Sequence, residues 1–298
     1  MARRFAFLAA AALAVTACHA GAKEAKRVRA ACEAGDAAAC NDFALKLQKG
    51  EYVLRDDARA AELFDRACTG GVGTGCTALA VILQRGRGVD RDSVRAVSLL
   101  RQGCDRGAMD GCAGLGVLYR AGAGVPRDLA RAASMFDRAC DGGEMSGCAH
   151  LGSLHVAGEG VARDFARAAA LFTRACDGDV VVGCVDLGRL RAAGTGIARD
   201  DSTAAELYEK ACEKNEPAGC FHLALAYESG SGRAQNFTRA SRLYRESCED
   251  RYGEACARLA ALYDKGAGVW RDTSRAKDLR REACDHGHRE SCDEPRGS

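Results

Sequence analysis

The sequence has little proline, little histidine and no strand-like alternation. Only three prolines and six histidines occur in 298 residues, whereas glycine reaches 35. Polar and apolar residues do not alternate with a period of two over a useful length, so β-strands are not predicted. With so little proline, the glycines indicate frequent helix ends rather than disorder. These absences favour an all-α protein of short helices.

An excess of charge of one sign is also missing. The chain carries 43 basic and 41 acidic residues, a formal net charge of +2, and the two signs alternate along the predicted helix faces. A nucleic-acid partner is therefore not expected, because such proteins carry a basic block or stripe. Beyond the first 17 residues no segment is long and apolar enough to span a membrane.

The common catalytic motifs are missing as well: HExxH, GxSxG, the P-loop and a GxGxxG entering a β-α unit. One pattern, "SRAK" from Ser274 to Lys277, matches the S-x-x-K of penicillin-binding proteins and serine β-lactamases. The S-D-N and K-T-G elements that this mechanism needs do not occur. We therefore expect no enzyme activity, no cofactor and no metal.

The N-terminal segment "MARRFAFLAAAALAVTAC" is typical of an export signal. A basic head precedes an apolar run from Phe5 to Ala17, which is too short to span a membrane. Small residues before Cys18 resemble a bacterial lipobox, so residues 1–17 are predicted as a lipoprotein signal peptide and Cys18 as the lipidated residue. Residues 18–28 would form a polar tether. His19 favours the outer membrane, on the periplasmic side; the alternative is an ordinary signal peptide in which Cys18 is incidental.

Cysteines are the abundant residue, and they follow a strict pattern. Without Cys18, sixteen of the 17 remain, as eight C-x7-C pairs that begin every 36 residues. A continuous helix would hold the members of a pair about 12 Å apart, too far for a disulfide, so the chain must turn between them. Equivalent cysteines of stacked repeats would also lie too far apart. Zinc is the weaker alternative, since no histidines repeat with the cysteines. The predicted disulfides are Cys32–Cys40, Cys68–Cys76, Cys104–Cys112, Cys140–Cys148, Cys176–Cys184, Cys212–Cys220, Cys248–Cys256 and Cys284–Cys292.

The period of 36 extends to other residue types and predicts a helical solenoid over residues 29–292. Apolar residues spaced by three and four predict two amphipathic helices in each unit. We expect seven helix pairs from Asp36 to Cys284. The segments "KEAKRVRAAC" and "HRESCDEPRGS" would cap the two ends, and residues 293–298 would form a C-terminal tail.

The stretch "GCAGLGVLYRAGAGVPRDLARAASMFDRAC" resembles a Sel1-like repeat, a relative of the tetratricopeptide repeat. The C-x7-C pairs resemble those of the cysteine-rich secreted Sel1-like proteins of Helicobacter. The resemblance implies a right-handed α/α superhelix whose concave face holds proteins or peptides. Some of these relatives carry a β-lactamase or penicillin-binding label.

A partner would bind on the first helices of the central repeats. Seven residues after the second cysteine, polar side chains replace apolar or aromatic ones in the middle repeats, and basic residues lie nearby. We expect a basic, aromatic-edged strip that takes an acidic peptide or a carboxylate-bearing cell-wall fragment, more strongly near pH 6 because of its histidines. The alternative is a solvated face. The candidate residues are Tyr119, Arg120, His150, His155, Arg189, Arg191, His222 and Tyr227.

These expectations together describe a monomeric, lipid-anchored, non-catalytic adaptor for proteins or peptides at the bacterial cell envelope. A binder of peptidoglycan-derived fragments is the second hypothesis, and a β-lactam hydrolase is the third.

Overall fold

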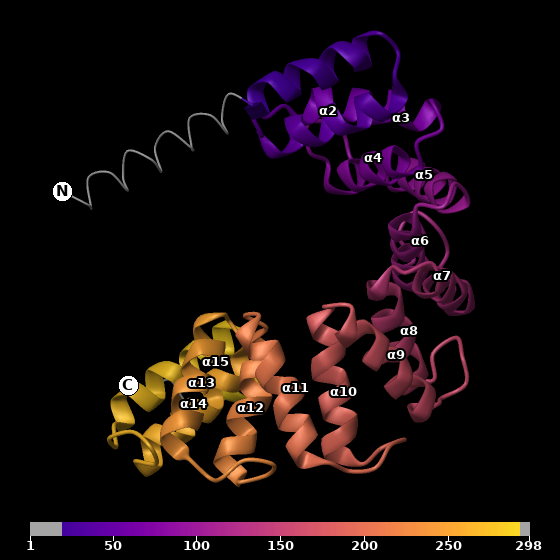
Figure 1. Cartoon of the computed structure of the whole chain (residues 1–298). Helices are drawn as coiled ribbons and strands as arrows, with labels where there is room; N and C mark the ends of the chain where they lie inside the picture. The colour runs from indigo at the N-terminus through magenta and orange to yellow at the C-terminus, as the bar shows by residue number, and fades with distance from the viewer. Residues whose placement is uncertain (1–19, 293–298) are drawn as a thin grey trace, which may run out of the picture. The chain divides into compact units, whose positions relative to one another are not determined.

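The computed structural model describes residues 20–292, and the chain divides into two compact units, Met1–Gly147 and Cys148–Ser298. The predicted signal peptide, Cys18 and the tail at 293–298 lie outside the described residues. Within these, every α-helix after residue 36 spans 13 residues, and the helices of each unit lie side by side as antiparallel pairs (Figure 1). The helices are α2 (Ala37–Lys49), α3 (Asp57–Thr69), α4 (Gly73–Arg85), α5 (Ser93–Asp105), α6 (Met109–Ala121), α7 (Leu129–Asp141), α8 (Met145–Ala157), α9 (Phe165–Asp177), α10 (Val181–Ala193), α11 (Asp201–Glu213), α12 (Pro217–Ser229), α13 (Phe237–Glu249), α14 (Gly253–Lys265) and α15 (Thr273–Asp285).

The seven predicted helix pairs are confirmed, and so is the all-α fold. Even-numbered helices, here called helices A, begin each repeat, and odd-numbered helices, here called helices B, complete it. An aspartate starts most helices B: the Asp92 side chain accepts a hydrogen bond from the Arg95 backbone N–H and so caps α5. Glycine ends most helices A in the left-handed conformation, as Gly86 does with a φ of 64°. The repeated aspartates thus fix where most helices B begin, and the repeated glycines fix where most helices A end.

The core lies between helices A and B of one repeat and the neighbouring repeat. Small residues let the helices approach closely: a Cβ at Gly116 would lie 2.6 Å from the ring of Phe136, which is fully buried. Gly188 meets the ring of Tyr208 in the same way. The alternation of small and aromatic residues along the repeat is therefore a packing pattern.

The disulfides have the predicted pairing. Most of them join the end of one helix B to the start of the next helix A, as Cys68–Cys76 joins α3 to α4 across a three-residue turn. Seven pairs lie within one unit of the chain, and their Cα–Cα distances run from 4.5 Å in Cys32–Cys40 to 5.0 Å in Cys284–Cys292. Cys140 and Cys148 are disulfide-bonded too. The turn brings together sulfurs that a continuous helix would keep apart.

The predicted tether is corrected by the structure. Residues 20–33 form a helix, so the chain from residue 20 to residue 28 is not an extended linker. Ala25 and Val28 are buried, at 2% and 6% exposure, because this helix occupies the place of a helix B before the first repeat. At the other end, a short 3₁₀ helix, η1 (Arg289–Ser291), follows α15.

Candidate functional site

Three of the predicted binding residues belong to the core. The side chains of Tyr119, His155 and Tyr227 are only 6%, 7% and 7% exposed. Their backbone carbonyls accept hydrogen bonds from the residues that cap the following helices B; the carbonyl of Tyr119, for example, accepts one of 2.9 Å from Asp128. The expectation that this column faces an accessible groove is therefore wrong. Its members pack against helix B because they lie four residues after a buried leucine on the same helix face.

Polar members of this column are accommodated inside the protein. Nδ1 of His155 lies 3.1 Å from the carbonyl oxygen of Ala162, and the Tyr227 hydroxyl accepts a 3.0 Å hydrogen bond from Arg239. Arg191 is half-buried, and its Nε has no hydrogen-bond partner among the described residues. Tyrosine, histidine and arginine can thus occupy an interior position where other repeats carry leucine.

Arg120 and His150 are half-buried. Arg120 lies in the first unit, and His150 lies close to the boundary between the units. The guanidinium of Arg120 lies over the Phe136 ring at 5.9 Å, within its own repeat. His150 lies on α8, the helix that crosses the boundary between the two units. Neither contributes to the groove described next.

The structure brings Arg189 and His222 together in a groove of the second unit. A cavity of about 260 Å³ lies across α10, α12 and α14, the helices A of three successive repeats, and we call it the helix-A groove. Arg189 comes from α10 and His222 from α12. The residues that line the helix-A groove are Val182, Val185, Asp186, Arg189, Glu216, Ala218, His222, Tyr252 and Glu254.

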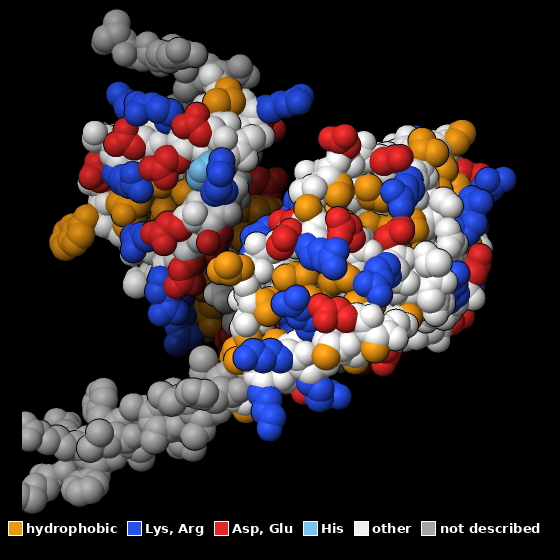
Figure 2. All heavy atoms as spheres, turned by 90° about the horizontal axis from the view of Figure 1, so that it is seen from above, with side chains coloured by type: hydrophobic (Ala, Val, Ile, Leu, Met, Phe, Trp, Pro, Cys, Tyr) orange, Lys and Arg blue, Asp and Glu red, His pale blue; other side chains and the backbone are white. Residues whose placement is uncertain are grey.

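The groove is acidic rather than basic, which corrects the predicted strip. Three carboxylates, Asp186, Glu216 and Glu254, line it against the single guanidinium of Arg189. Glu216 precedes α12 and Glu254 lies in the first turn of α14, where a negative charge is favoured by the helix dipole. Arg189 is paired with Asp186 at 3.4 Å. Elsewhere, basic and acidic side chains are interspersed on the face seen in Figure 2.

Burial changes the protonation of the groove residues. It lowers the pKa of His222 to about 4, and the positive charge of Arg189 contributes in the same direction. The imidazole stacks on the ring of Tyr208 with centroids 5.0 Å apart. Burial also raises the pKa of Asp186, against the influence of Arg189. With its pKa lowered in this way, His222 is not expected to strengthen the binding of an acidic ligand near pH 6.

Several groove residues were not predicted. Tyr252 and Glu216 occupy the position four residues before the second cysteine, which varies from repeat to repeat between apolar, acidic and aromatic residues. That variation between repeats was the available signal, and the position two residues after the second cysteine, which holds Asp186 and His222, varies as well. Val182 adds an apolar surface, with 51% of its area exposed.

The described residues give no support for catalysis at the S-x-x-K pattern or for metal binding at the cysteines. Ser274 and Lys277 are exposed residues near the start of α15, and the Ser274 backbone N–H helps to cap that helix by donating to Asp272. Cys248, Cys256 and His286 come within ligand distance of one another, but both cysteines are in a disulfide and offer no thiolate. No helix among residues 20–292 combines the length and hydropathy needed to cross a bilayer.

The fold and the site define a disulfide-bonded α-helical repeat scaffold. The sequence model of the Sel1 repeat matches most of the chain, so the protein belongs to the Sel1 repeat family. The matched residues are 37–72, 74–107, 110–144, 146–180, 181–216, 217–252 and 253–288.

Two solved structures share this fold. The chain is similar to c5321, a protective antigen of uropathogenic Escherichia coli with an SLR fold, at 26% identity and a TM-score of 0.76; the match covers 90% of this chain but only 57% of that protein's length. A Sel1 repeat protein from Oxalobacter formigenes matches at 19% identity and a TM-score of 0.75, over 82% of this chain and 96% of that one. Cysteine-rich protein B of Helicobacter pylori is 27% identical over 44% of this chain and 93% of its own, with a TM-score of 0.37. A search of curated proteins found no match.

Proposed function

We propose that the protein is a non-catalytic adaptor that holds an extended segment of a partner protein in the helix-A groove. The observation that carries the proposal is the position of that groove across α10, α12 and α14. Its volume of about 260 Å³ is below the usual range of roughly 300–1,000 Å³ for small-molecule sites. It suits one anchoring side chain of a peptide whose backbone crosses successive repeats.

The charges of the groove favour a basic anchor. An arginine or lysine side chain would meet the carboxylates of Asp186, Glu216 and Glu254, while Val182 and the stacked ring of His222 provide apolar contact. This choice replaces the acidic peptide expected from the sequence. Exposed ion pairs contribute little, so the half-buried Asp186 should contribute most to discrimination.

Sixteen cysteines in disulfides are typical of an oxidising compartment outside the cytoplasm. Within that compartment we place the protein at the periplasmic side of the bacterial envelope, attached through lipid on Cys18, preferably at the outer membrane. The support for the anchor is the segment from residue 1 to residue 18, whose sequence resembles a lipoprotein signal. Mass spectrometry of the N-terminal peptide from native membranes would detect the lipid.

A selection from a displayed library of random linear peptides tests the proposed function. The bait is the oxidised chain from residue 19 onward. We expect enriched peptides to share one basic residue next to apolar ones. Their affinity should fall at least tenfold in an Asp186→Asn/Glu254→Gln double variant. Asp110→Asn is the matched control, because Asp110 lies on a helix A of the other unit and burial raises its pKa as it raises that of Asp186.

Failure of the selection, or an equal loss in the control variant, would refute peptide binding at this groove. Peptidoglycan-derived muropeptides are then the next ligands to titrate. Hydrolysis of a chromogenic β-lactam that is lost on Ser274→Ala would instead establish an enzyme.

A further inference from the structure

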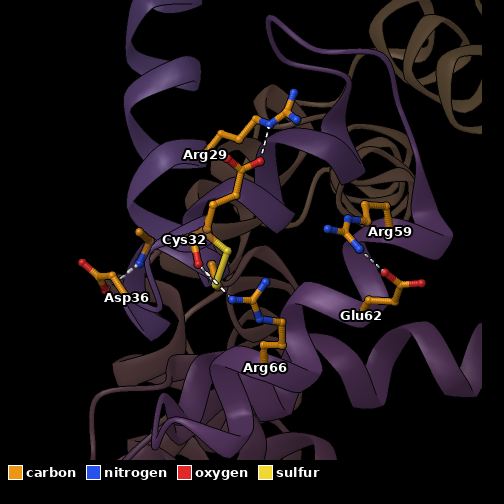
Figure 3. Close-up of a disulfide and its surroundings, with 9 residues drawn as sticks. Arg29, Cys32, Asp36, Arg59, Glu62 and Arg66 are labelled. Carbon is orange, nitrogen blue, oxygen red and sulfur yellow. Dashed lines mark hydrogen bonds and ion pairs between the residues drawn. A yellow bond between two sulfur atoms is a disulfide. The ribbon is translucent and has the colours of Figure 1, made fainter.

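A second cavity lies at the start of the first unit, far along the chain from the helix-A groove. It measures about 350 Å³ and is bounded by helix 20–33, α2 and α3. Figure 3 shows the guanidinium groups of Arg29, Arg59 and Arg66 arranged around one side of the Cys32–Cys40 disulfide. Phe43, Leu47 and Leu63 provide its apolar wall.

At the equivalent place in the next repeat an ion pair joins two helices B. There Arg95 of α5 reaches Asp65 of α3, with Nη2 and Oδ1 2.7 Å apart. One period earlier, the corresponding residues are Arg59 and Arg29, which are both cations. They cannot pair with each other. Instead each pairs with a glutamate of its own helix: Arg29 with Glu33 at 2.8 Å, and Arg59 with Glu62.

We call the place where two successive helices B meet the helix A between them a junction; the cavity lies at the first junction and the Arg95–Asp65 ion pair at the second. The third junction, one repeat further on, shows what two arginines at these positions accommodate. Arg101 and Arg131 are equivalent to Arg29 and Arg59, and the phenol of Tyr119 lies between them. The hydroxyl accepts a 3.1 Å hydrogen bond from Arg101, and the guanidinium of Arg131 lies 5.8 Å from the ring centroid. The residue equivalent to Tyr119 at the first junction is Leu47, whose side chain is shorter and has no oxygen.

We infer that the cavity at the first junction binds a small aromatic carboxylate, free or as the last residue of a peptide. The aromatic ring would take the place that the tyrosine ring fills at the third junction, against Leu47 and Leu63. The carboxylate would lie between Arg29 and Arg59, whose planar guanidinium groups suit two-pronged contacts with a carboxylate.

The acidic residues at this cavity do not oppose such a ligand. Glu33 already accepts from Arg29, and the Asp56 side chain caps α3 by accepting from the Arg59 backbone N–H at 2.9 Å. Arg66 is held by the carbonyl of Cys32 at 2.9 Å and forms a fixed positive edge. The volume lies within the usual range for small-molecule sites.

Isothermal titration of the oxidised chain tests the inference with N-acetylphenylalanine and with a five-residue peptide that ends in phenylalanine. Each probe is compared with its C-terminal amide. We expect both acids, or one of them, to bind and the amides to bind at least tenfold more weakly. Binding of the peptide alone would assign the site to protein C-termini, and binding of the free acid alone would assign it to metabolites.

Two variants and one control localise the site. Arg59→Gln should weaken the acid at least tenfold, while Arg95→Gln, its equivalent one repeat later, should leave binding unchanged. Leu47→Tyr places in the cavity the ring found at the third junction and should abolish binding while the protein remains folded. Equal binding of acids and amides, no binding of either acid, or full binding by Leu47→Tyr would overturn the inference. The Asp186→Asn/Glu254→Gln variant should bind normally, so this test is independent of the proposed peptide groove.

Discussion

Nη2 of Arg138 donates a 2.8 Å hydrogen bond to the backbone carbonyl of Cys104, which lies 34 residues earlier in the preceding repeat. Arg66 makes the same contact with Cys32 at 2.9 Å, and Lys210 makes it with Cys176 at 2.8 Å. The cation lies two residues before the first cysteine of its own repeat. Three of the disulfide-closed turns are therefore held twice, by their own covalent bond and by a charged side chain from the next repeat.

Removal of this cation should destabilise the contact between the turn and the next repeat. Arg138→Met keeps the aliphatic stem but leaves the Cys104 carbonyl without its charged donor. Charge-assisted hydrogen bonds contribute about 1.5–3 kcal/mol, and because the Arg138 side chain is 43% exposed we expect a loss of only about 1 kcal/mol in the free energy of unfolding. Urea denaturation measures it. Asp105→Asn is the control, since it removes only the exposed ion pair of Arg138, and an equal loss there would mean that the carbonyl contact contributes nothing.

Loss of one disulfide should weaken its own repeat most. Cys104 and Cys112 are eight residues apart, and the chain-entropy model gives about 2.5 kcal/mol for closing such a loop. Because repeats contact only their neighbours, hydrogen exchange of the Cys104→Ala/Cys112→Ala variant should rise chiefly in α5 and α6. In reductant the stability difference from the wild type should disappear. A difference that persists there would assign the loss to packing of the two buried sulfurs.

The second glycine of each G-x-G loop should be far less replaceable than other left-handed glycines. Gly124 has a φ of +74°, and a Cβ there would lie 2.4 Å from the carbonyl oxygen of Ser93. Gly107 has a φ of +85° and nothing within 4 Å. We expect Gly107→Ala to cost about 1–2 kcal/mol from backbone strain alone, and Gly124→Ala to cost about 1–3 kcal/mol more from overpacking. Thermal unfolding compares the two; similar costs would mean that the loop shifts freely away from Ser93.

The equivalent residue in the first repeat shows what makes this glycine necessary elsewhere. Tyr52 has a φ of 60° there, yet it is not a glycine. The helix that precedes it carries Gly21 at the position equivalent to Ser93, and the Tyr52 ring packs where a Cβ on Gly21 would lie. The constraint is therefore contact with the preceding helix B and not the backbone conformation alone.

The fold was predictable because its determinants are local and repeated. The turn between Cys104 and Cys112 follows from the reach of a disulfide, and the helix limits follow from Asp92 and Gly86. The buried face of each helix A was predictable too, although His155 was assigned to the wrong face. His155 lies four residues after Leu151, on the same buried face. Its polarity suggested a surface position, whereas the carbonyl of Ala162 satisfies it inside.

The groove could not be derived in the same way. Asp186, His222 and Glu254 converge only because α10, α12 and α14 stack at a particular offset, and no local rule gives that offset. The difference between the basic lining expected from the sequence and the acidic lining of the structure has the same origin. Arg189 pairs with Asp186 on its own helix, and carboxylates from the next two repeats then outnumber it.

The pH dependence of stability should report the burial of His222. Its pKa is lowered from 6.5 to about 4 in the folded chain, mainly by burial. Between these values the unfolded chain takes up a proton that the folded chain does not, so lowering the pH favours unfolding. The contribution of the neutral imidazole to the free energy of unfolding is fully present above pH 6.5. It is lost as the pH falls towards 4, by up to about 3 kcal/mol.

His222→Phe separates this effect from the titration of carboxylates. Phenylalanine keeps an aromatic ring on Tyr208 but takes up no proton, so the variant should lose less stability than the wild type between pH 6.5 and pH 4. Urea denaturation across this range measures the difference, and NMR titration of the imidazole measures the pKa directly. Parallel stability curves would show that His222 is protonated in the folded state with an ordinary pKa. A groove with an imidazolium at pH 6 would repel a basic anchor, so the same titration also tests whether the proposed peptide site keeps its acidic character in a mildly acidic compartment.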